Sequence, residues 1–177
     1  MPVAAASSRE ASAKHLQVML RRVLYTARML AALLCLQILH VAFLLLHDWI
    51  RLGTLNDTRA VRAANPGGKL LRATLVSSAP FVIALFFSLR HQRTGYPHWL
   101  FLFLWIAYAL LFFGELQAWW FPFFFGTEPA RVARYDQMFG ATHSFLPPRN
   151  GIRINTLHTL LHLATLLTLL ALADLTL

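Results

Sequence analysis

At 177 residues the chain is long enough for one compact domain, and 58% of its residues are hydrophobic while only 13% are charged. Soluble globular proteins carry about 25% charged residues, so this composition excludes an ordinary soluble domain and indicates that lipid solvates much of the surface. The net charge of +9 is spread over segments that flank apolar runs, where basic side chains usually contact lipid head groups. It therefore does not predict nucleic-acid binding.

The chain begins with small and polar residues and continues into long apolar runs. Residues 1–13 are expected to form a flexible tail ahead of one four-helix transmembrane domain, residues 14–177. From Lys14 to Arg28 apolar and basic residues alternate at helical spacing, which predicts an interfacial helix leading into the first span. One crossing of the hydrocarbon takes about 20 helical residues. Four runs fit that length, at about 29–47, 70–89, 98–121 and 154–174.

The connections between these spans are unequal in length. Arg90–Pro97 is a short turn, whereas Asp48–Arg72 and Thr127–Arg153 are long. The pattern predicts an all-α, up-and-down four-helix bundle with both long loops on one membrane face. Lysine and arginine number seven on the N-terminal side and nine on the long-loop side, so the positive-inside rule assigns no orientation.

Proline and aromatic residues mark the second and third spans. Pro80 lies in the middle of the second span and predicts a kink there, and Pro122 predicts that the third helix bends or ends nearby. The third span is unusually rich in Trp, Phe and Tyr. Such a cluster is typical of an interfacial belt or a packing surface, and it is also a candidate docking surface for a membrane-protein partner.

Three ionisable side chains are expected at a similar depth in the bilayer. By helical rise, His40, Glu115 and His162 each lie about 10 Å or slightly more inside the long-loop face, on three different spans. Ionisable groups within a span are rare and usually functional. A carboxyl group beside imidazoles is a proton-transfer unit, a metal site or a structural strut, and we predict His40, Glu115 and His162 as catalytic candidates.

A second set of polar residues is expected nearer the surface, as binding candidates around a ligand's polar end. Arg149 and Arg153 precede the fourth helix, where a phosphate head group is a suitable partner for a helix N-terminus. The same arginines would serve equally as interfacial anchors. The full set of predicted ligand-binding residues is His47, Asp48, His158, Arg149, Arg153, Asn155 and Tyr108.

Histidine spacing leaves metal or haem binding open as an alternative. His158 and His162 are four residues apart on one helix and can share a metal ion, with His40 or Glu115 as the third ligand. A haem between His40 and His162 is also geometrically allowed. No second carboxylate lies in the spans to build a carboxylate-bridged di-metal centre, and the sequence assigns no firm metal ligand.

The motifs HDW, GELQAWW, THSFLPPRNGI and NTLH, read between His47 and His162, resemble those of small four-span membrane proteins of bacterial genomes. That resemblance implies a bacterial inner-membrane location and no activity. Four spans with intramembrane acid and histidine residues are more loosely similar to the emopamil-binding/EXPERA group of sterol isomerases and lipid-binding receptors. The acidic residues differ in order and spacing, so no residue roles are carried over.

The sequence contains no GxSxG, Walker-type, HExxH or CxxC motif, and it gives no support to hydrolase, nucleotide-binding or zincin functions. Three hypotheses remain. The leading one is a membrane protein whose His/Glu site, open to the long-loop face, binds or transforms a hydrophobic or lipid-like molecule. The others are a haem- or metal-binding redox protein and an accessory subunit of a larger membrane complex.

Overall fold

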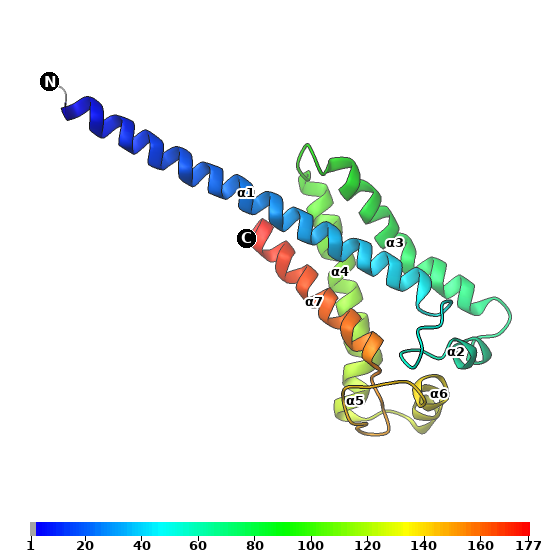
Figure 1. The fold of residues 1–177 in the computed structure, drawn as a ribbon. Coiled ribbons are helices and arrows are strands. Elements are labelled where there is room, and N and C mark those ends of the chain that lie inside the picture. Colours follow the sequence, from blue (N-terminus) through cyan, green and yellow to red (C-terminus); the bar gives the residue numbers. More distant parts are fainter. Residues whose placement is uncertain (1–2) are drawn as a thin grey trace.

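The computed structural model describes the backbone of residues 3–177 and the side chains of residues 14–177. The chain is all-α in this described part (Figure 1). Its four long helices are α1 (Val3–Leu46), α3 (Lys69–His91), α4 (His98–Glu115) with its continuation, and α7 (Thr156–Thr176). Together they confirm the predicted four-helix bundle.

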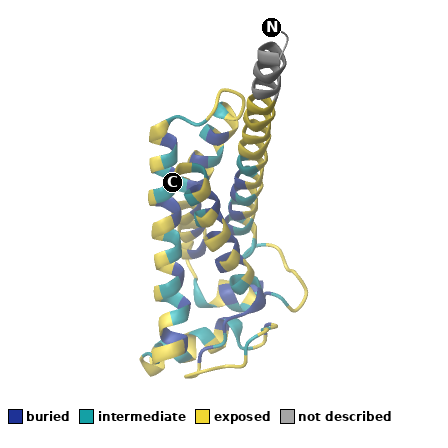
Figure 2. Ribbon diagram, turned by 90° about the vertical axis from the view of Figure 1, so that its left-hand side faces the viewer, coloured by how far each residue is buried: buried dark blue, intermediate teal, exposed yellow. Residues whose placement is uncertain are grey.

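The four helices form a closed ring in chain order. α1 packs against α3 and α7, and α4 packs against the same two neighbours. Buried residues face the centre of this ring, whereas the outward faces are exposed and apolar (Figure 2). Four segments are long and apolar enough to cross a membrane: Lys14–Leu46, Lys69–His91, His98–Phe125 and Thr156–Thr176. An apolar exterior around a partly polar interior is what a lipid solvent requires.

The first helix differs from the sequence prediction. An interfacial helix before the first span was predicted, but α1 is one unbroken helix of 44 residues, about 66 Å long at the usual rise. Its N-terminal part extends well beyond the other helices (Figure 1). The predicted tail, residues 1–13, enters this helix at Val3, and residues 1–2 lie outside the described residues. No proline or glycine interrupts residues 14–46, so nothing in that sequence favours a break.

Both long loops carry short helices and lie at one end of the bundle, as predicted (Figure 1). We call them together the loop cap, residues 47–68 and 126–155. The first loop contains α2 (Thr58–Ala64), whose N-cap Asp57 accepts from two backbone N–H groups. The second contains α6 (Pro129–Phe139). Arg134 on α6 donates to the Asn65 side chain after α2 at 3.0 Å, and this bond ties the two loops together.

The third helix passes through a π turn directly after Glu115. The π segment η1 spans Leu116–Trp120, and α5 (Phe121–Phe125) follows it. Pro122 has no N–H to give to the carbonyl of Ala118, four residues earlier. Tyr135 on α6 donates its hydroxyl to that carbonyl at 2.8 Å instead. The helix was predicted to bend or end near Pro122; it passes through the π turn just before this proline and ends at Phe125, three residues after it.

Candidate functional site

Glu115, Thr165 and His40 meet in the interior of the bundle. Thr165 on α7 lies 2.8 Å from Oε1 of Glu115 on α4 and 3.0 Å from Nε2 of His40 on α1. All three side chains are buried, with Glu115 6% exposed and the other two 0%. The predicted association of a carboxylic acid with an imidazole across separate spans is confirmed, and a threonine hydroxyl joins the two.

Counting hydrogens restricts the protonation of this junction. Nδ1 of His40 lies 2.7 Å from the Leu36 carbonyl, which only accepts, so Nδ1 carries a proton. In a neutral ring Nε2 then accepts from Thr165, and the Thr165 oxygen must accept from a protonated Glu115. In a charged ring Nε2 donates to Thr165, and Thr165 donates to a Glu115 carboxylate. The Thr165 hydroxyl also lies 3.1 Å from the Leu161 carbonyl, and in both arrangements it connects the carboxyl group of Glu115 to the imidazole of His40.

His162 lies one turn before Thr165 on the same helix and has a defined tautomer. Nε1–H of Trp120 donates to Nδ1 of His162 at 3.0 Å. Nδ1 therefore accepts, and in the neutral ring the proton is on Nε2. Nε2 of His162 and Oε2 of Glu115 are buried without a hydrogen-bond partner in the described part of the chain. Such groups are costly unless a ligand or water satisfies them.

Tyr108 belongs to the wall of this junction. Its ring packs edge-on to His40, with ring centroids 5.0 Å apart. The side chain is fully buried, and its hydroxyl finds no partner among residues 14–177. Tyr108 was predicted to contact the ligand, and the structure places it beside His40, outside the cavities described below.

His47, Asp48 and His158 gather at the end of the bundle nearest the loop cap. Nε2 of His47 lies 3.2 Å from Oδ1 of Asp48, and the His47 and His158 rings are 5.6 Å apart. Burial raises the pKa of Asp48, although the neighbouring His47 acts in the opposite direction. Asn155 caps α7 and accepts from Nδ1 of His158 at 2.7 Å, which leaves Nε2 of His158 as the acceptor in the neutral ring.

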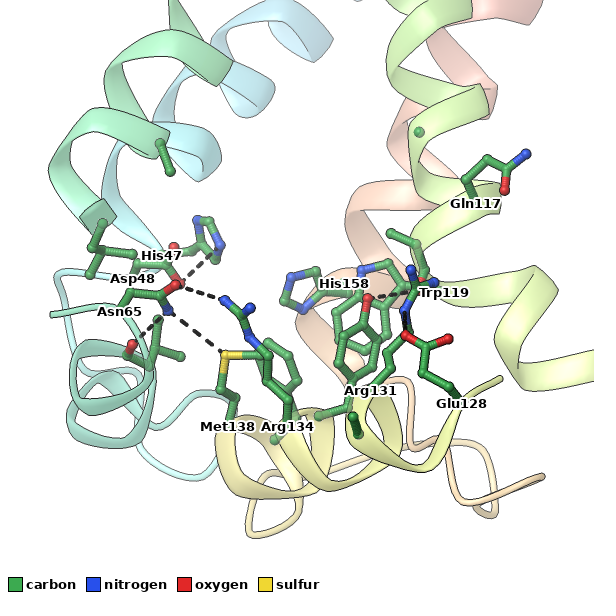
Figure 3. A pocket seen from close by; sticks show the side chains of 18 residues that line it. His47, Asp48, Asn65, Gln117, Trp119, Glu128, Arg131, Arg134, Met138 and His158 are labelled. Atoms are coloured by element: carbon green, nitrogen blue, oxygen red, sulfur yellow. Dashed lines mark hydrogen bonds and ion pairs between the residues drawn. The ribbon is translucent and has the colours of Figure 1, made fainter. Parts of the chain in front are cut away.

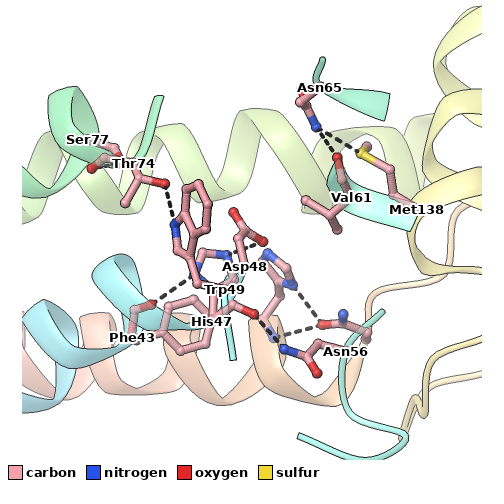
Figure 4. A network of polar contacts seen from close by, with 12 residues as sticks. Phe43, His47, Asp48, Trp49, Asn56, Val61, Asn65, Thr74, Ser77 and Met138 are labelled. Atoms are coloured by element: carbon pink, nitrogen blue, oxygen red, sulfur yellow. Dashed lines mark hydrogen bonds and ion pairs between the residues drawn. The ribbon is translucent and has the colours of Figure 1, made fainter. Parts of the chain in front are cut away.

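The turn after α1 is held in place by Asn56. Its amide donates to the His47 carbonyl (Figure 4). It also donates to the Ile50 carbonyl and accepts from the Leu52 N–H. The adjacent Trp49 indole donates to Thr74 on α3 at 3.1 Å. These bonds satisfy backbone groups left free at the helix end and fix the position of His47 and Asp48.

Two cavities meet at this cluster. The outer cavity, about 820 Å³, lies under α6 and is lined by charged residues of both signs. Figure 3 shows His47, Asp48 and Asn65 on one side of this cavity and Trp119 and His158 on the other, with α6 closing one end. The inner cavity, about 550 Å³, lies between the long helices; its lining is mainly apolar and includes Glu115 and His162. The residues that line both cavities are His47, Gly114, Ala118, Trp119 and His158.

The remaining predicted binding residues lie elsewhere. Arg149 stacks over Phe124, and Arg153 lines a separate surface cavity beyond α6. The outer cavity is lined instead by Arg131 and Arg134 of α6. Arg149 and Arg153 were expected near the site because they precede α7, but a tight turn separates them: the backbones of Arg149 and Ile152 exchange hydrogen bonds around Gly151, which has a φ of 75°.

The histidines do not converge as a metal site. No group of three or more His, Cys, Asp or Glu side chains within residues 14–177 is arranged to hold a metal ion. In particular, Nε2 of His40 is directed at Thr165, and Nδ1 of His162 accepts from Trp120. The predicted alternative set of His40, His158 and His162 is therefore not brought together around one point.

Several residues of the site were not among the predicted site residues, although the sequence pattern around two of them pointed towards the site. Thr165 shares the helix face of His158 and His162, and a hydroxyl at that spacing was a candidate partner for them. Trp120 lies two residues before Pro122, where a helix irregularity was expected. The α6 arginines gave no such signal, because α6 itself was not predicted.

Comparison with protein-family models, with curated proteins and with solved structures finds no match.

Proposed function

We propose that this chain is a multi-pass membrane protein that binds a lipid-like amphiphile in the two joined cavities. The polar end of the ligand lies in the outer cavity, and its apolar part extends past Trp119 into the inner one. The main support for this proposal is that the outer cavity, lined by charged residues, and the inner cavity, lined mainly by apolar residues, share part of their lining. A mainly apolar cavity with a few polar groups is typical of small-molecule sites.

The charges of the outer cavity suit a polar head group. Arg131 and Arg134 provide donors, and Asp48 and Glu128 provide acceptors. Arg131 is already 3.5 Å from Glu128, and Arg134 donates to Asn65, so both guanidinium groups are held at the cavity rim. Glu115 lines the inner cavity and is joined through Thr165 to His40, so it supplies at the inner end the carboxyl group that proton transfer to a bound ligand requires.

Gly114 offers a sharp test, because it lines both cavities and a Cβ added there meets no atom within 4 Å. We expect Gly114→Leu to fill the junction while the protein still folds. The measurement is quenching of tryptophan fluorescence by a single-chain amphiphile brominated along its chain, added to protein in nanodiscs of unbrominated lipid. Wild type and Gly114→Ala should show saturable quenching, and Gly114→Leu should lose it.

Trp119 and Trp99 identify where the quenching occurs. Trp119 lies in the shared wall, whereas Trp99 is 46% exposed at the other end of the bundle. Trp119→Phe should remove most of the saturable signal, and Trp99→Phe should preserve it. Equal saturable quenching in Gly114→Leu and wild type would overturn the proposed site.

A further inference from the structure

Two buried polar atoms without a partner belong to residues that line an otherwise mainly apolar cavity. They are Oε2 of Glu115 and Nε2 of His162, and both residues line the inner cavity. Glu115 is 6% exposed and His162 is 4% exposed. The other inner-cavity residues are mostly Leu, Phe, Ala and Ile. A plain hydrocarbon chain would fill this space and leave both atoms unsatisfied.

The hydrogen-bonding character of His162 is fixed by its neighbour. Since Trp120 donates to Nδ1, the neutral ring carries its proton on Nε2, which is a donor without a partner in the described part of the chain. Oε1 of Glu115 is engaged with Thr165, so its Oε2 is the oxygen left for a ligand. Oε2 donates when Glu115 is protonated and accepts when it is ionised. The pair therefore matches a single ligand oxygen that accepts from His162 Nε2–H. This oxygen also accepts from Glu115 when the carboxyl group is protonated, and it donates to Glu115 when the carboxyl group is ionised.

We infer that the ligand's apolar part carries one oxygen function, a ketone, ester or hydroxyl, which binds between His162 Nε2–H and Glu115 Oε2. This inference rests on the proposed amphiphile site and names the chemical class of its ligand. A site built to hydrogen-bond a buried oxygen discriminates strongly against the analogue that lacks it, because its own polar groups are then left unpaired.

The test compares single-chain amphiphiles of equal length and head group that carry a methylene, a ketone or a hydroxyl at one chain position. Competition against the brominated probe in nanodiscs gives the relative affinities. Scanning the position of the oxygen along the chain, we expect one position at which an oxygenated chain binds about tenfold more tightly or better. A preference for the ketone indicates a protonated Glu115, and a preference for the hydroxyl indicates a carboxylate.

Three variants locate the preference. His162→Leu and Glu115→Leu should abolish it while the methylene chain still binds. Trp120→Phe removes the donor that fixes the His162 tautomer, so Trp120 acts as a positioning residue, and this variant should weaken the preference without changing methylene binding. Phe113→Leu, at an outward-facing site that is 56% exposed, is the matched control and should retain the full preference.

The outcomes separate this inference from the proposed function. Saturable binding of all three chains with equal affinity at every oxygen position would overturn the oxygen-function inference and leave the amphiphile site intact. Absence of saturable binding of any chain would overturn both. Retention of the full preference in both His162→Leu and Glu115→Leu would overturn the assignment to these two residues.

Discussion

At the residue scale, the properties of the site depend on one hydroxyl group that joins three helices. Within residues 14–177, only the Thr165 hydroxyl forms hydrogen bonds with both Glu115 and His40. Removing its oxygen leaves two buried polar groups unpaired, and each such group costs about 1–3 kcal/mol. We therefore expect Thr165→Val to lower the free energy of unfolding by at least about 1 kcal/mol, measured by SDS titration of the detergent-solubilised protein.

Serine provides the matched control for this threonine. Thr165→Ser keeps the hydroxyl and removes only a methyl group, so its loss of stability should be clearly smaller than that of Thr165→Val. The valine side chain has nearly the shape of threonine, so a difference between the two variants reports the hydrogen bonds. Equal stability of wild type and Thr165→Val would mean that the junction is not the connection described here.

The depth of polar side chains was accessible from the sequence, whereas their partners were not. The rise per residue predicted that His40 and Glu115 lie at a similar depth, and in the structure both form hydrogen bonds with Thr165. His162 was assigned to the same layer but bonds to Trp120, because the rotation of each helix about its axis decides which neighbour a side chain reaches. That rotation depends on packing between helices, which a single sequence does not specify.

At the element scale, the π turn after Glu115 sets the relation between Glu115 and the tryptophans that follow it. A π turn accommodates one extra residue, so it rotates the later side chains by about 100° relative to a continuous α-helix. The turn is consistent with the missing N–H of Pro122, and Tyr135 satisfies the carbonyl of Ala118 that this leaves free. The loop cap and the third helix are thus coupled through this hydrogen bond, and a second one runs from the Asn150 amide to the Phe123 carbonyl at 3.0 Å.

This coupling predicts a non-additive pair of substitutions. Tyr135→Phe should lower the free energy of unfolding by about 1 kcal/mol, because the Ala118 carbonyl loses its donor. In a Pro122→Ala background the new N–H of residue 122 can serve that carbonyl, so the same Tyr135→Phe change should cost much less. A double-mutant cycle by SDS titration measures the difference. Strict additivity would contradict the proposed role of Tyr135.

Elements whose signal is a long apolar run were predicted well, and elements without such a run were not. The spans α3 and α7 were placed within two residues of their observed ends. In contrast, α6 is amphipathic and only 11 residues long, and isolated helices of that length are marginal in water. It gains stability from contacts with α2, which its own sequence does not reveal. Consequently Arg131 and Arg134, which line the outer cavity, were not predicted.

At the scale of the whole molecule, the loop cap and the short turn after α3 lie at opposite ends of the up-and-down ring, and we predict that they lie on opposite sides of a membrane. The number of apolar runs and the unequal loop lengths predicted an up-and-down bundle, and the contacts between successive helices agree with that prediction. Its polar interior is asymmetric. The outer and inner cavities lie toward the loop cap, so a ligand's polar end would face one aqueous compartment only.

Single cysteines test this arrangement, since Cys35 is the only native one. In a Cys35→Ala background, Thr54→Cys and Phe145→Cys place exposed thiols in the loop cap, and Thr94→Cys places one in the short turn. With a membrane-impermeant maleimide applied to sealed vesicles of one orientation, the two loop-cap thiols should share one labelling state and Thr94→Cys should show the opposite state. Detergent should make all three reactive. Labelling of Thr94→Cys and Phe145→Cys from the same side would contradict four crossings, because exactly one span, His98–Phe125, lies between these two positions.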